Sequence, residues 1–502
     1  MTQKKKLLYN TVFSLIYQAV AFICGFILPK CLLRYYGSEV NGLISSITHF
    51  LGFITLAECG IGAVVQSALY KPLAEKNETE ISKIIISAER FFRKISYLLI
   101  VYTAIIVLVY PLISDSSFDR SFTAGLILIA AFSSFCQYFF SITYSLLLEA
   151  DALAFIPFIT RSIALILNVV LSVILMRHKV DIRIVKLASS FIFLIQPLVY
   201  RIYVNKHYHL NKKLVLTEEP IKQKWNGFAQ HIAAAVLRNT DTVVLTLFST
   251  LESVSVYSVY CMVIAGIKQI VFSLTAGVQP LFGNLYAKKD TENLNKVFSG
   301  VEWSMHTAII FLFTCTALLI VPFVSVYTKD ITDVNYIEPL FGILLCAAFA
   351  SHCIRLPYNM MVLAAGHYKQ TQLSCIIEAL LNIVISVLLV VQFGLPGVAI
   401  GTLVAMIYRT CYLALYLSKA ILYRKLSHFL KHIAVDALSI ICMVLGTFWI
   451  KLSSVTYSAW FIQALETAAI CGVISIAVNL IFYKKHTIDF ISKIFRHKKK
   501  KA

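Results

Sequence analysis

Eight ionisable side chains within long apolar segments are the residues of this sequence best suited to chemistry. Five are cations and three are carboxylates: Arg161, Arg238, Lys268, Arg355 and Arg409, and Glu58, Asp241 and Glu378. Charged groups at membrane depth are costly, so they usually face a water-filled cavity or a partner of opposite charge. A guanidinium offers a planar fork of donors that fits phosphate oxygens. We therefore expect the cations to line a cavity for an anionic group; the alternatives are snorkelling to the interface and pairing between helices.

Arg238 and Asp241 are three residues apart, so both lie on one face of a helix. This pair could neutralise itself and ease insertion, or Arg238 could bind an anionic headgroup while Asp241 orients it. Glu58 and Glu378 could carry a coupling proton or bind Na⁺, and a structural hydrogen bond is an equal alternative. No further cofactor or metal is expected, because the histidines and the 12 cysteines lack ligand spacing. The ATP-binding motif G-x-x-x-x-G-K-[ST] and the motif G-x-S-x-G are both missing.

The segments that carry these charges are too apolar for a soluble protein. Hydrophobic residues make up 59% of the 502 and charged residues 14%, against about half and a quarter in soluble domains. Apolar runs of about 20 residues can cross a bilayer as helices. We predict an all-α integral membrane protein with about fourteen transmembrane helices. The predicted spans are 8–33, 40–70, 92–114, 121–149, 152–176, 184–205, 226–250, 254–287, 300–327, 336–365, 370–393, 396–420, 432–453 and 458–483.

Basic residues are distributed unevenly between the two sides of the predicted membrane. With the N-terminus inside, the inner segments hold 30 Lys and Arg residues and the outer segments hold 9. Because Lys and Arg collect in cytoplasmic loops, both termini are predicted to be cytoplasmic, including the basic tail that ends in Lys498–Lys501. This asymmetry also explains the net charge of +20, so a nucleic-acid partner is not expected.

The chain contains an internal duplication. At an offset of 213 residues, Val65-Gln66 matches Val278-Gln279, and at an offset of 214 the segment 167–175 matches 381–389. A repeat of six helices restores the starting orientation, so the halves are predicted to be parallel repeats. Polar segments at 71–90 and 288–300, with apolar residues at helical spacing, are predicted to form short helices along the cytoplasmic interface.

Four parts follow from this duplication. We predict an N-lobe of transmembrane helices 1–6 at 1–205 and a cytoplasmic linker at 206–225. A C-lobe of helices 7–12 would cover 226–420. Two added helices, 13 and 14, and the basic cytoplasmic tail would occupy 421–502. Two lobes of six helices that face each other are typical of a transporter.

The first eighty residues resemble a known pattern. The segment Arg34-Tyr-Tyr-Gly37-Ser-Glu39-Val-Asn-Gly42-Leu43 is similar to the Arg-x-x-Gly-x-Glu-x-x-Gly-Leu segment of polysaccharide transporters. The segment Leu56-Ala-Glu58-Cys-Gly60-Ile-Gly62 follows it, as in Gram-positive capsule and oligosaccharide flippases. The chain therefore resembles Wzx-type flippases of the multidrug/oligosaccharidyl-lipid/polysaccharide exporter superfamily. The motif residues Arg34, Gly37, Glu39 and Gly42 fall at the outer end of the first predicted span, where gating or packing is expected.

The resemblance implies a V-shaped pair of six-helix bundles in the bacterial cytoplasmic membrane. These would flip undecaprenyl-pyrophosphate-linked oligosaccharide repeat units from the inner to the outer leaflet, for capsule or another surface polysaccharide. Membrane lipids and a polysaccharide polymerase are the other expected partners. Two transport alternatives are a lipid II flippase and a multidrug/cation antiporter, although cationic drugs favour an acidic cavity. A membrane glycosyltransferase or polymerase would need large outer loops, and the predicted outer loops are short; we expect no enzyme.

Overall fold

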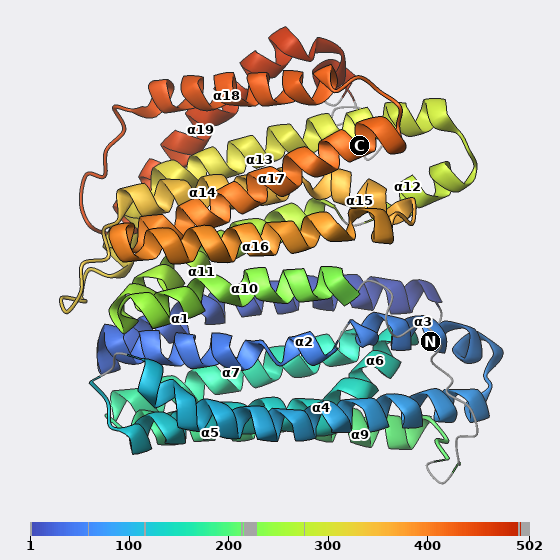
Figure 1. Cartoon of the computed structure of the whole chain (residues 1–502), viewed down its shortest axis with the longest axis vertical. Helices are drawn as coiled ribbons and strands as arrows, with labels where there is room; N and C mark the ends of the chain where they lie inside the picture. The colour runs from blue at the N-terminus through green and yellow to red at the C-terminus, as the bar shows by residue number, and fades with distance from the viewer. Residues whose placement is uncertain are drawn as a thin grey trace. The chain divides into compact units, whose positions relative to one another are not determined.

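A computed structural model describes residues 3–58, 60–114, 117–211, 214, 228–275, 277–489 and 492. These described residues form helices and connecting segments, with no β-strand among them (Figure 1). Twelve helices are long and apolar enough to cross a membrane. The first of these, Lys4–Glu58, contains the first predicted span and most of the second, and a further helix occupies the predicted seventh span. The all-α, roughly fourteen-helix membrane architecture is therefore confirmed.

The chain divides into two compact units, Met1–Ser258 and Val259–Ala502. The first unit holds α1 (Gln3–Gly52), α2 (Thr55–Glu58), α3 (Ile61–Glu75), α4 (Glu78–Ile113), α5 (Arg120–Cys136), a π-helical turn (Gln137–Ser141), α6 (Ile142–Ala150), α7 (Phe155–Arg177), α8 (Ile182–Phe193), α9 (Ile195–His207) and α10 (Phe228–Phe248). The unit boundary falls inside α11 (Leu251–Leu274). The predicted lobe boundaries remain a prediction. Most of the predicted linker and the basic tail lie outside the described residues.

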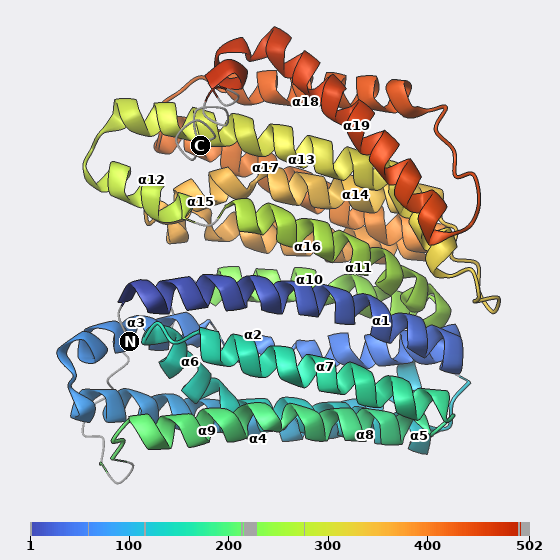
Figure 2. The same cartoon turned by 180° about the vertical axis from the view of Figure 1, so that it is seen from behind.

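The second unit continues beyond α11 with α12 (Val278–Ala287), α13 (Thr291–Tyr327), α14 (Pro339–Ile354), α15 (Leu356–Ala364), α16 (Tyr368–Phe393), α17 (Leu395–Ala420), α18 (Ser427–Thr447) and α19 (Tyr457–Phe482). Within each unit, long helices pack side by side: α1 along α7 in the first, and α13 along α19 in the second (Figure 2).

Helix boundaries repeat at the offset that the sequence predicts. The starts of α4 and α13 are 213 residues apart, as are those of α8 and α17, and the starts of α6 and α15 are 214 apart. The N-caps repeat as well. Asn77 accepts a hydrogen bond from a backbone N–H in the first turn of α4, and Asp290 does so in α13. Short polar side chains at these positions satisfy donors that would otherwise lack a partner.

The prediction of short interface helices at 71–90 and 288–300 is wrong. Lys76, in the left-handed region at φ 53°, ends α3, and α4 then runs without interruption from Glu78 to Ile113. The apolar positions Ile81, Ile84 and Ile85 are buried in the first unit's core, so they hold α4 in the bundle. At the repeat position, α13 likewise starts at Thr291 and continues to Tyr327.

Three motif glycines account for the shape of the N-terminal segment. Gly37 has φ 83° and ψ 176°, so α1 is broken there between the first two predicted spans. A Cβ on Gly42 would lie 1.8 Å from the carbonyl oxygen of Leu251, so only glycine permits this approach of α1 to the start of α11. Gly60 precedes α3 with φ 69°, where a Cβ would collide with the ring of His231.

Candidate functional site

The predicted intramembrane charges of the second unit converge on one carboxylate. Glu378, on α16, is 3% exposed. Arg355 donates a hydrogen bond from Nη1 to Oε1 of this carboxylate, and Nε of Arg409 lies 3.9 Å from Oε2. Arg409, also 3% exposed, donates a second hydrogen bond to the carbonyl oxygen of Thr371 at 2.9 Å. The structure therefore brings together three side chains that the sequence could only name separately.

A helix break positions Arg355 beside this carboxylate. Helix α14 ends at Ile354 and α15 begins at Leu356, with Pro357 in its first turn. Pro357 lacks a backbone N–H, and in the first turn of α15 no hydrogen bond from that group to a preceding turn is needed. The Nη2 atom of Arg355 lies 2.7 Å from Nδ1 of His352, which accepts this hydrogen bond.

Lys268 adds a third cation to the same part of the second unit. Its Nζ atom lies 4.4 Å from the centroid of the Phe349 ring, a cation–π distance. Phe349 and His352 are on α14, with ring centroids 6.3 Å apart. We name Lys268, Arg355, Arg409, His352 and Glu378 the Glu378 cluster. It contains three basic side chains of lysine or arginine and one carboxylate.

Arg355, Glu378 and Arg409 lie far from the ends of the apolar spans that contain them. Arg355 is nine residues from the end of the apolar span Pro339–Ala364, and Glu378 and Arg409 are ten or more residues from either end of α16 and α17. At a rise of 1.5 Å per residue, these distances are about 14 Å or more. An arginine side chain is too short to reach the interface over that length, so these cations are not explained by snorkelling.

Arg161, in the first unit, has a partner that the sequence did not reveal. Its Nη2 atom donates to Oγ of Ser145 at 2.9 Å and lies 3.3 Å from Oε1 of Glu149. Gln66 donates to the other oxygen of Glu149 at 2.7 Å. Glu149 was not selected because it stands at the end of a predicted span. Its spacing from Arg161, across the tight connection between α6 and α7, was the available signal.

Arg238 and Asp241 occupy different environments, although they are on the same helix. Arg238 is exposed, whereas Asp241 is 3% exposed and accepts a hydrogen bond from Tyr257 at 2.9 Å. Arg238 lies close enough to Glu58 to interact electrostatically, and Glu58 accepts a hydrogen bond from the hydroxyl of Tyr138.

The remaining motif residues, Arg34 and Glu39, lie toward one end of α1. Arg34 is exposed. Glu39 accepts hydrogen bonds from the backbone N–H of Ser117 at 2.9 Å and from its hydroxyl at 2.7 Å. These hydrogen bonds join α1 to the connection between α4 and α5, and such a contact is compatible with the packing or gating role expected for the motif.

A stripe of small polar side chains on α1 was missed by reasoning from charges. Asn41 donates to Oγ of Ser255 at 2.8 Å, the hydroxyls of Ser46 and Thr246 are 2.7 Å apart, and His49 bonds to Asn239 at 3.0 Å. Small polar residues often join membrane helices in this way. Their spacing along one face of residues 38–49 was the signal.

Across the described residues, no group of three His, Cys, Asp or Glu could hold a metal ion.

Comparisons with known proteins agree with this architecture. No protein-family model matches the sequence, and no curated protein matches it significantly. Among solved structures, the lipid II flippase MurJ in an inward closed conformation matches with a TM-score of 0.70 and 16% identity, over 95% of this chain and 99% of that one.

Two multidrug transporters also match. An inward-facing MATE family transporter of the MOP superfamily matches with a TM-score of 0.58 and 13% identity, over 82% of this chain and 95% of that one. The MATE transporter DinF-BH matches with a TM-score of 0.55 and 16% identity, over 84% of this chain and 98% of that one. These proteins are transporters and a flippase, not enzymes. The chain therefore has the multi-pass membrane fold shared by MurJ and the MATE transporters.

Proposed function

We propose that this protein flips undecaprenyl-pyrophosphate-linked oligosaccharide repeat units from the inner to the outer leaflet of the bacterial cytoplasmic membrane. The product would supply capsule or another surface polysaccharide, with a polymerase as the next partner. The two repeated halves would open alternately to the two sides, with both termini cytoplasmic. The observation that carries the proposal is the excess of cations over carboxylates in the Glu378 cluster at mid-span depth.

The chemistry of the cluster suits a pyrophosphate. Arg355 is held by Glu378 and His352, so its guanidinium is oriented before a ligand arrives. Lys268 and Arg409 add two further basic side chains to the cluster. Bidentate arginine–phosphate contacts are among the strongest charge-assisted hydrogen bonds, and a low-dielectric site strengthens them. Arg161 and Arg238 are the proposed counterparts in the first unit.

Coupling to an ion gradient is assigned to a different carboxylate. Glu378 already accepts a hydrogen bond from Arg355 and lies 3.9 Å from Nε of Arg409, so both of its oxygens have a cationic neighbour. Glu58 has a neutral hydroxyl, that of Tyr138, as its hydrogen-bond partner, so it is the better candidate to take up H⁺ or Na⁺. Asp241, which accepts from Tyr257, is the second candidate in the same unit.

A lipid II flippase is the second candidate function. The match to the lipid II flippase MurJ over nearly the whole chain favours it. The two functions differ in the sugars that the cavity must hold. A multidrug/cation antiporter is less compatible with a cluster of net positive charge, since cationic drugs would be repelled.

Translocation in proteoliposomes tests the proposal. The purified protein is reconstituted with defined undecaprenyl-pyrophosphate-linked oligosaccharides or with lipid II, with and without H⁺ and Na⁺ gradients. We expect oligosaccharide transfer in excess of lipid II transfer. Transfer of lipid II alone would favour the second candidate, and transfer of neither would contradict both.

Two substitutions test the cluster itself. Arg355→Gln and Lys268→Gln each remove one cation, and a hydrogen bond to a charged group contributes about 1.5–3 kcal/mol, so transport should fall roughly 10- to 100-fold. Arg120→Gln and Lys329→Gln are matched controls, because both side chains are exposed and lie outside the cluster. Full transport by both cluster variants would refute the assignment.

A further inference from the structure

A basic pocket in the second unit lies outside the Glu378 cluster. It has a volume of about 320 Å³ and is formed by α13, α18 and the segment around the end of α19. Its lining residues are Ser299, Glu302, Trp303, His428, Lys431, His432, Phe482, Tyr483, Lys484, Lys485 and His486. Volumes of this order accommodate small ligands or headgroups. Six of these eleven residues are lysine or histidine.

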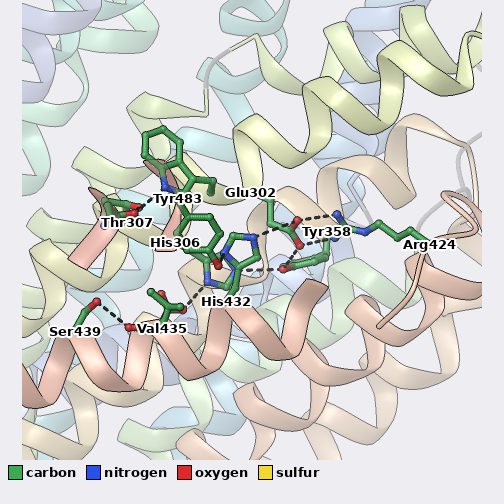
Figure 3. Close-up of polar contacts among 12 residues, drawn as sticks. Glu302, His306, Thr307, Tyr358, Arg424, His432, Val435, Ser439 and Tyr483 are labelled. Carbon is green, nitrogen blue, oxygen red and sulfur yellow. Dashed lines mark hydrogen bonds and ion pairs between the residues drawn. The ribbon is translucent and has the colours of Figure 1, made fainter. Parts of the chain in front are cut away.

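The single carboxylate of the pocket is already neutralised. Glu302 is 1% exposed and is held by both terminal nitrogens of Arg424, one of them at 2.8 Å. Tyr358 donates a further hydrogen bond to Glu302 at 2.6 Å, and Nε2 of His432 lies 3.6 Å away. Figure 3 shows Glu302 among these partners. Glu302, with these partners, does not form an ion pair with Lys431, Lys484 or Lys485, which the structure also describes. Lys431 donates a hydrogen bond to the carbonyl oxygen of Phe482 at 3.3 Å and lies 4.8 Å from the centroid of the Tyr483 ring.

Aromatic side chains give the pocket a defined wall. Trp303 is fixed by a hydrogen bond from Nε1 to Oδ1 of Asn479 at 2.7 Å, and its ring stacks on His486. Tyr483 stacks on His432 with ring centroids 4.9 Å apart, and the Tyr483 hydroxyl lies 2.9 Å from Nδ1 of the same histidine. These contacts hold two of the pocket's histidines in place.

The surroundings of the pocket point to a membrane lipid. Lys431 is in the first turns of α18, and Lys484 and Lys485 follow the end of α19 at Phe482, so all three stand where apolar spans meet the interface. Large apolar side chains beside them are exposed: Leu430 at 57% and Ile481 at 74%. Basic pockets between membrane helices at this level bind anionic headgroups.

We propose that this pocket binds a phosphate group, carried by the headgroup of an anionic membrane lipid. The lysines would contact the phosphate oxygens, the histidines and Tyr483 would supply further hydrogen bonds, and the exposed apolar side chains would contact the acyl chains. Helices α18 and α19 follow the duplicated helices, so the first half has no second copy of this site.

Lipid binding to the full-length protein in detergent micelles tests this proposal. Affinity for phosphatidylglycerol is compared with affinity for phosphatidylcholine, in the unaltered protein and in the triple variant Lys431→Gln/Lys484→Gln/Lys485→Gln. Each lysine near an anionic lipid contributes about a fivefold gain in affinity, so the triple variant should lose about 100-fold. The matched control is Lys288→Gln/Lys289→Gln/Lys369→Gln, three exposed lysines outside the pocket.

The outcomes separate the possible ligands. Loss of phosphatidylglycerol binding in the pocket variant but not in the control supports a lipid headgroup. Saturable binding of inorganic phosphate, lost in the same variant, supports the phosphate site with a soluble ligand. Equal affinity for the two lipids, or equal losses in both triple variants, would overturn the proposal. The single variant Lys484→Gln, exposed and so compatible with folding, should lose about fivefold. Because transport is not measured, failure here leaves the proposed function standing.

Discussion

Replacing Glu378 by glutamine should destabilise the protein more than any exposed carboxylate change. The substitution keeps the shape of the side chain but removes the negative charge shared by Arg355 and Arg409. Arg409 is 3% exposed and Arg355 retains only 11% exposure of its side chain, so neither gains much water in compensation. Breaking a buried ion pair by removing one partner leaves an uncompensated charge, which costs about 3–5 kcal/mol. Asp330→Asn, in the exposed connection between α13 and α14, should be nearly neutral.

A second substitution distinguishes the electrostatic cause from a packing defect. In the double variant Glu378→Gln/Arg409→Met, one of the two stranded cations is gone, so stability should recover in part relative to Glu378→Gln alone. Apparent melting temperatures of the purified proteins in one detergent, at one scan rate, give the comparison, because unfolding of large proteins is often irreversible. A Glu378→Gln protein as stable as the unaltered one, or a double variant less stable than both single variants, would refute the reasoning.

Two further predictions concern the first unit. Gly42→Ala places a Cβ 1.8 Å from the carbonyl oxygen of Leu251, so the apparent melting temperature should drop by several degrees, whereas Gly25→Ala, with no atom within 4 Å, should leave it unchanged or raise it. Asp181 caps α8, and its hydrogen bonds to Arg183 lower the pKa of the Asp181 carboxyl. A carboxyl whose pKa is lower in the folded state stabilises that state when the pH is above the pKa of the unfolded chain. The stability advantage of the unaltered protein over Asp181→Asn should therefore be full at neutral pH. It should vanish as the pH falls through the pKa of the folded state in the acidic range. An advantage that persists in acid would contradict this.

The transmembrane architecture could be predicted because the sequence features that indicate it lie within single segments or recur at a fixed offset. Apolar runs marked the helices, and the offset of 213 to 214 residues anticipated the matching starts of α4 and α13. The error at 71–90 had a physical reason. Apolar residues at helical spacing indicate a buried face but not what buries it, and Ile81, Ile84 and Ile85 pack into the bundle instead of facing lipid.

The sequence predicted which residues could form the site. It did not predict which of these side chains contact one another. Charge and depth selected Arg355, Glu378 and Arg409 correctly as intramembrane ions. Their convergence depends on which faces of α14, α16 and α17 meet, which no single helix specifies. Arg161 was expected to line a cavity, to snorkel or to pair with another helix, and its partner Glu149 could not be named because that residue belongs to another helix. The Glu302 network was overlooked since Glu302 and Arg424 stand at span edges, where charges are common.

Arg355 binds the carboxylate of Glu378 and is also the residue that joins α14 to α15. In the first half, the π-helical turn that ends at Ser141 occupies the same repeat position, so both halves have an irregular joint at matching places. An anion that competes with Glu378 for Arg355 would pull on the residue that joins two short helices. Exchange of one negative partner for another would therefore act directly on the residue that joins α14 to α15, so that ligand binding and the geometry of this joint would be coupled.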